Sequence, residues 1–207
     1  MTTPRTLSLF LGLTAALALA ACHDDTSTGP PTHSGPPRYN NPNALIDAHA
    51  SALTNRDLAA YTNLLDEGFQ YFPQSEDLAD LTWLTGDSWG RADELGMIGH
   101  MFDPDFQPAS GMHAGSVDSI DATLTVVTVQ PAPTGVGYVV TTHAVIRVMY
   151  DASNGAATDV RLEFHLVPHD GYFLISEIHE MPLHAPALSG MRAVEPSSWG
   201  QVKSLYR

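Results

Sequence analysis

Residues 43–71 read NALIDAHASALTNRDLAAYTNLLDEGFQY, and this stretch decides how the chain begins to fold. Its first half repeats apolar side chains at helical spacing, and Asn41-Pro42 just before it supplies a capping side chain and a proline at the first helical position. Residues 57–65 predict a second helix, and residues 69–72 predict a short strand that ends at a proline. The stretch therefore predicts two helices followed by a strand.

Further along the chain, the spacing of the apolar residues changes: it is helical up to Phe102, and from about residue 117 every second residue is apolar. Ser88 is expected to cap a third helix that reaches Phe102. Alternating β-branched segments then predict four strands, and turn sequences such as Asn154-Gly155 and Asp170-Gly171 separate them. The strands are expected at residues 117–127, 137–150, 158–167 and 172–181. Three helices followed by a four-stranded antiparallel meander predict an α+β fold.

This order of elements resembles the nuclear transport factor 2-like (SnoaL-like) superfamily over residues 43–181. The resemblance implies N-terminal helices packed on a curved antiparallel β-sheet, a cone that encloses a mostly apolar pocket. The candidate pocket residues are His49, Tyr61, Tyr71, Trp83 and Met97. The superfamily contains isomerases, cyclases, dehydratases, hydrolases and non-catalytic modules, so the fold does not fix the function. In its ketosteroid-isomerase branch the aspartate base would fall on Phe72 or Pro73, so we do not expect that isomerase chemistry.

One acid–base pair follows from the register of the last two strands. A two-residue turn at Asp170-Gly171 pairs positions that sum to 341, and this places Phe164 opposite Glu177 and Leu162 opposite His179. Glu177 and His179 would then lie together on an otherwise apolar face. Such a pair is either structural, at the open end of the sheet, or lines a wet cavity, where it would act as a general base. A wider loop in place of the two-residue turn would slip this register.

We expect no metal or cofactor from the sequence motifs. The histidines form no HxxxH or HExxH arrangement, and no phosphate loop, dinucleotide fingerprint or serine elbow is present. The single cysteine lies outside the predicted domain. A metal site would therefore need histidines brought together from separate strands.

The N-terminus predicts export and lipidation. Residues 7–21 form an uncharged apolar run that is short for a membrane span, and it closes as Leu19-Ala20-Ala21-Cys22. This closing sequence resembles the lipobox of bacterial lipoproteins, which implies a lipid on Cys22 and an extracytoplasmic place in the cell envelope, at the inner or the outer membrane. We expect a signal peptide over residues 1–21, a Pro/Gly/Ser-rich tether over 22–40 and one domain over 41–207.

The charge of the chain argues against one class of partner, and its C-terminal sequence predicts a loop and a helix. The 207 residues include 9 basic and 23 acidic side chains, a net charge of −14, which disfavours nucleic acid. Residues 185–195 are expected to form a loop, and Ser198-Trp199-Gly200-Gln201 resembles a capping box that opens a short terminal helix. Three hypotheses remain open: a pocket that binds a small apolar ligand, an acid–base enzyme that uses His179 and Glu177, and a homodimeric interaction module.

Overall fold

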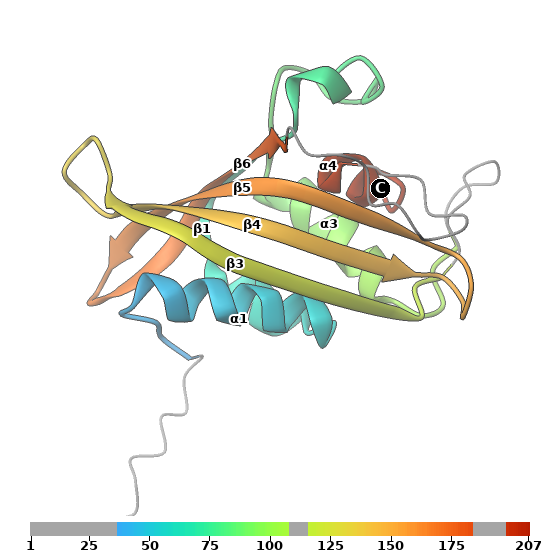
Figure 1. The fold of residues 1–207 in the computed structure, drawn as a ribbon, viewed down its shortest axis with the longest axis horizontal. Coiled ribbons are helices and arrows are strands. Elements are labelled where there is room, and N and C mark those ends of the chain that lie inside the picture. Colours follow the sequence, from blue (N-terminus) through green and yellow to red (C-terminus); the bar gives the residue numbers. More distant parts are fainter. Residues whose placement is uncertain (1–36, 108–115, 184–197) are drawn as a thin grey trace, which may run out of the picture. The chain divides into compact units, whose positions relative to one another are not determined.

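The computed structural model describes residues 37–107, 116–183 and 198–207 (Figure 1). The chain divides into two units, Met1–Ser34 and Gly35–Arg207, and the described residues belong to the second. The signal peptide, Cys22, the tether up to residue 36 and the expected loop at 185–195 lie outside the described residues. None of the helices in the described part combines the length and hydropathy that a membrane span requires.

The two N-terminal helices are confirmed, and a side chain caps each of them: Asn41 caps the first, as predicted, and Asp57 caps the second. In α1 (Pro42–Thr54), the Asn41 side chain accepts a hydrogen bond of 2.9 Å from the Asn43 amide. In α2 (Leu58–Leu64), the Asp57 side chain accepts one of 2.9 Å from the Ala60 amide. These bonds satisfy amides that lack partners within the helix.

The predicted cap of the third helix is wrong. The helix α3 (Arg91–Phe102) begins after Gly90, which offers no side-chain cap. The residues just before it, Trp89–Gly90, form the short strand β2, which pairs with β1 (Leu65–Phe72). A 3₁₀ turn, η1 (Ser75–Asp77), lies between the two strands. Pairing with a strand some twenty residues away therefore overrides the local capping signal of Ser88.

The α+β prediction is confirmed, with one correction to the sheet. The four predicted long strands form a meander of β3 (Ser119–Pro131), β4 (Tyr138–Met149), β5 (Gly155–His169) and β6 (Tyr172–Pro182). The whole sheet has the order β2-β1-β6-β5-β4-β3, and β1 runs parallel to β6. It is therefore a six-stranded mixed sheet. The parallel pair joins segments about a hundred residues apart, which local periodicity does not reveal.

One face of the sheet carries the core. Buried and half-buried residues alternate regularly along β4, as the period of two predicts. The helix α1 packs against β3, and α3 packs against β1 (Figure 1). A short terminal helix, α4 (Trp199–Ser204), contacts α3 and β5, and the Ser198 side chain accepts a 3.0 Å bond from the Gln201 amide as the capping motif predicts. The C-terminus is therefore part of the core.

Candidate functional site

The predicted register of the last hairpin holds for four pairs and then fails. Asp170 and Gly171 both have positive φ angles, 48° and 85°, as a type I′ turn requires. Pairing follows the predicted register as far as Leu166 opposite Ile175, and a bulge then shifts it by one residue. The Ser176 hydroxyl donates a 3.1 Å hydrogen bond to the His165 carbonyl within this bulge.

The bulge reverses the predicted face of the acid–base pair. Glu177 lies opposite His165 and His179 opposite Glu163, whereas the apolar residues of β5 face the core. The expected placement of Glu177 and His179 among Leu162 and Phe164 is therefore wrong. Their side chains are 39% and 32% exposed and lie on the outer face of the sheet. Glu180, one residue further on, takes the buried position instead.

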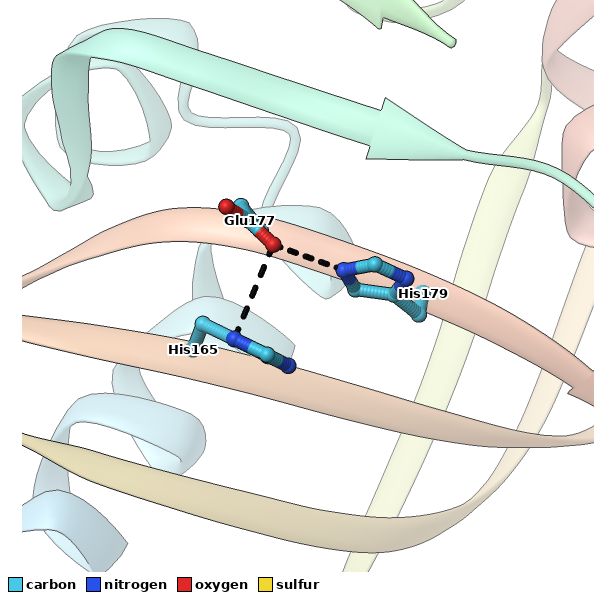
Figure 2. A group of neighbouring side chains, drawn as sticks. All are labelled: His165, Glu177 and His179. Carbon is cyan, nitrogen blue, oxygen red and sulfur yellow. Dashed lines mark hydrogen bonds and ion pairs between the residues drawn. The ribbon is translucent and has the colours of Figure 1, made fainter. Parts of the chain in front are cut away.

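Glu177 and His179 nevertheless contact each other, together with His165 (Figure 2). His179 Nε2 lies 2.7 Å from Glu177 Oε2, and His165 Nδ1 lies 3.6 Å from the same oxygen. The other ring nitrogen of His165, Nε2, lies 3.0 Å from Glu163 Oε1. Within the described part of the chain, His165, Glu177 and His179 are close enough to share one metal ion.

The five candidate pocket residues lie in the core or at its edge. His49, Tyr61, Tyr71 and Met97 are buried, and Trp83 is half-buried. None of them lines the hollow of about 20 Å³ that the structure shows beside α1 and α2, which has room for about one water molecule. In this state the candidate pocket residues pack against side chains.

Two of them, His49 and Trp83, carry buried polar atoms that have no hydrogen-bond partner among the described residues. The ring of His49 is 1% exposed and packs against Tyr61 and Phe164, with ring centroids 5.1 and 5.2 Å away. Neither ring nitrogen has a hydrogen-bond partner within residues 37–107, 116–183 and 198–207. Burial, and to a smaller extent the charge of Lys203, lowers the pKa of His49 to about 3.

The interior also contains a buried ion pair between Lys203 and Glu94. Neither residue was among the predicted site residues. Lys203 of α4 and Glu94 of α3 are both fully buried, and Lys203 Nζ lies 3.0 and 2.8 Å from the two carboxylate oxygens of Glu94. The Tyr61 hydroxyl and the Trp89 indole also donate to Glu94, at 2.6 and 2.7 Å. The ammonium lies 3.2 Å from the ring centroid of Tyr71. We call Tyr61, Tyr71, Trp89 and Glu94 the amine cage.

Burial shifts the pKa values of Lys203, Tyr61 and Tyr71. Burial lowers the pKa of Lys203, and Glu94 opposes that change by attracting the ammonium. Burial first, and then the nearby carboxylates, raise the pKa of the Tyr61 and Tyr71 hydroxyls. Both tyrosines therefore stay protonated and remain donors near neutral pH.

Glu180 holds the beginning of α4 in place. Its carboxylate accepts hydrogen bonds from the Trp199 and Gly200 amides at 2.7 and 2.8 Å, and from the Tyr71 hydroxyl at 2.6 Å. A Cβ atom on Gly200 would lie 3.3 Å from Glu180 Oε2 and 3.1 Å from Pro73 Cβ, so glycine allows this close approach. The carboxylate thus satisfies amides at the start of the helix.

The sequence carries a signal for each of three buried residues that were not predicted as site residues, Glu94, Lys203 and Glu180. Glu94 shares a helical stripe with Ile98 and Met101, and Lys203 shares one with Trp199 and Tyr206. A charged residue on an apolar stripe indicates a buried partner. For Glu180 the signal is the odd spacing of the apolar residues Ile175 and Ile178, which indicates a bulge between them.

Comparison with known proteins establishes the fold. No protein family model and no curated protein sequence matches the chain. Two solved structures from Novosphingobium aromaticivorans are similar. One is provisionally assigned as an aromatic ring hydroxylase, with 13% identity, a TM-score of 0.51 and coverage of 70% of this chain and 87% of that one. The other is provisionally assigned as a scytalone dehydratase, with 10% identity, a TM-score of 0.50 and coverage of 74% and 89%.

An NTF-2 like protein of unknown function from Shewanella oneidensis is also similar, with 12% identity, a TM-score of 0.42 and coverage of 66% of this chain and 93% of that one. The described domain has the α+β fold of the NTF2-like (SnoaL-like) superfamily, as the sequence predicted. At these identities the likeness concerns the fold and carries no activity to this chain.

Proposed function

We propose that this chain is a lipid-anchored binding domain of the cell envelope whose ligand is a small organic molecule with an ammonium group and an apolar body. The ligand enters the interior where α4 now lies, and its ammonium replaces that of Lys203. The anchoring rests on the lipobox-like sequence that ends at Cys22. Pairing of two copies through the sheet stays a prediction.

The observation that carries the proposal is the amine cage around Lys203. It offers a carboxylate held by two donors and an aromatic face beneath the ammonium. These are the groups that recognise organic cations in proteins. The unpartnered nitrogens of His49, which packs on Tyr61, supply further polar atoms for a ligand deeper in the interior.

Exchange of α4 for a ligand is energetically reasonable. A buried ion pair contributes little net stability, because desolvation of the two charges offsets most of their attraction. A ligand ammonium that takes the place of Lys203 restores the same contacts with Glu94. The apolar body of the ligand would then cover the surface that Trp199 and Val202 of α4 bury now.

The test uses the full chain and a panel of primary amines with apolar bodies, each matched to the alcohol of the same carbon skeleton. Binding is measured by thermal shift, and amide hydrogen exchange then follows residues 199–206. We expect some amines, and none of their matched alcohols, to raise the melting temperature and to speed the exchange of α4. The proposal fails if no amine binds or if α4 keeps its protection when one does.

A further inference from the structure

We propose that His165, Glu177 and His179 form a binding site for one divalent transition-metal ion on the outer face of the sheet. One ligand atom from each of the three residues lies within 4.8 Å of the other two (Figure 2). Two imidazoles and one carboxylate are a common ligand set for zinc and related ions, with at least one further position left for water. This site is separate from the amine cage and does not depend on it.

The backbone brings the three side chains together on two paired strands. His165 on β5 and Glu177 on β6 are direct cross-strand partners, and His179 lies two residues further along β6 on the same face. The bulge at Ser176 turns Glu177 and His179 outward. Bulges of this kind often re-aim side chains next to functional sites. The ligands therefore lie on rigid strands and not on loops.

The distances leave room for an ion after small side-chain movements. Glu177 Oε2 lies 2.7 Å from His179 Nε2 and 3.6 Å from His165 Nδ1. Ligand atoms around a tetrahedral zinc ion are about 3.3 Å apart, given metal–ligand bonds of about 2.0–2.1 Å. The ion would replace the proton shared by His179 and Glu177, and that pair would open by less than about 1 Å. Ligand atoms as far apart as 4.8 Å would have to close by about 1.5 Å, which side-chain rotation can supply.

Glu163 orients His165 as a metal ligand. A carboxylate oxygen only accepts hydrogen bonds, so the 3.0 Å contact of Glu163 Oε1 with His165 Nε2 puts the proton on Nε2. In neutral His165 the lone pair is then on Nδ1, the atom that faces Glu177. A carboxylate behind a histidine ligand is the usual arrangement of metal sites in proteins.

The ring of His179 is also held. Phe72 on the neighbouring strand β1 stacks on it, with ring centroids 4.2 Å apart and an interplanar angle of 7°. The ring of His165 lies 4.8 Å from that of His179 on the other side. Elsewhere on the same sheet, His143 meets one carboxylate, that of Asp159, at 2.6 Å. His143 is therefore a matched control for an ordinary histidine–acid pair.

The experiment titrates the full chain with Zn²⁺ by calorimetry and with Co²⁺ by visible absorption. We expect one ion per chain. H165A, H179A and E177Q should each weaken binding at least tenfold and remove the Co²⁺ bands, because each removes a ligand. H143A should bind as the wild type does, and circular dichroism should show that all four variants fold. Unchanged affinity in H165A and H179A, or no binding by the wild type, would overturn the proposal.

A further variant tests Glu163 as a positioning residue. E163Q keeps the three ligands but loses the carboxylate that fixes the proton on His165. We expect a loss of affinity of about 10- to 100-fold and a shifted Co²⁺ spectrum. A spectrum and affinity equal to those of the wild type would contradict this role and leave the three-ligand site to be judged on H165A and H179A.

Discussion

His49 gives the protein a pH dependence that can be measured at a single residue. Its pKa is about 3 in the folded chain, below the ordinary histidine value of 6.5 that the unfolded chain keeps, so unfolded chains bind the proton first as the pH falls. Stability present above pH 6.5 is therefore lost progressively toward pH 3. Between pH 7 and pH 5, protonation linked to His49 lowers the free energy of unfolding by about 2 kcal/mol.

The variant His49→Leu should remove that contribution. We expect its free energy of urea unfolding to fall less steeply between pH 7 and pH 5 than that of the wild type. At pH 7 it should be as stable as the wild type or more so, because the substitution removes two unsatisfied nitrogens. Parallel pH curves for the two proteins would show that His49 does not titrate as described.

The Lys203–Glu94 pair should respond strongly to the loss of one partner and weakly to the loss of both charges. K203M keeps most of the side-chain volume but leaves the Glu94 carboxylate buried without its counter-charge, and it should lose about 3–5 kcal/mol of stability. The double variant K203M/E94Q should recover most of that loss in urea unfolding. Additive losses would argue against a coupled pair.

Because of the bulge in β6, deletion of one residue from this strand should be tolerated. Removing Ser176 would place Glu177 directly after Ile175, so the buried and half-buried alternation of β6 would become regular while the pairing with β5 beyond the bulge is kept. We expect this deletion variant to fold, with a lower melting temperature because the bend at the bulge is lost.

Deletion of His143 is the matched comparison. It lies in the regularly paired middle of β4, between β3 and β5, and its loss would turn one half of that strand inside out. We expect no cooperative unfolding transition from that variant by circular dichroism. Similar effects of the two deletions on folding would contradict the strand register described here for β4 and β6.

The candidate site could be predicted from the sequence only in part, because the bulge shifts the strand register. Periodicity predicted α1, α2 and the meander, and Asn41 predicted the start of α1, because these signals are local. The pairing of β1 with β6 and the meeting of Glu94 with Lys203 join distant segments. The single residue of slip at Ser176 then moved Glu177 and His179 to the other face. They still formed a pair, since residues two apart on a strand share a face whatever the register.

At the scale of the whole molecule, attachment to the membrane should depend on one atom, the sulfur of Cys22. We expect the wild type, expressed in a bacterium, to incorporate labelled palmitate and to sediment with membranes. C22A should incorporate none and, once the apolar residues 1–21 are removed, should be released as a soluble protein, because its strongly negative charge gives no attraction to anionic headgroups. Membrane association of unlabelled C22A that lacks residues 1–21 would contradict the lipid anchor.

The central claim is that Lys203 occupies an interior site built for an ammonium group. The variant K203A removes three methylenes and the ammonium, which are the atoms of n-propylamine. We predict that n-propylamine raises the melting temperature of full-length K203A, that 1-propanol does so far less, and that K203A/E94Q responds to neither. A K203A protein that responds equally to the amine and the alcohol, or to neither, would contradict the claim.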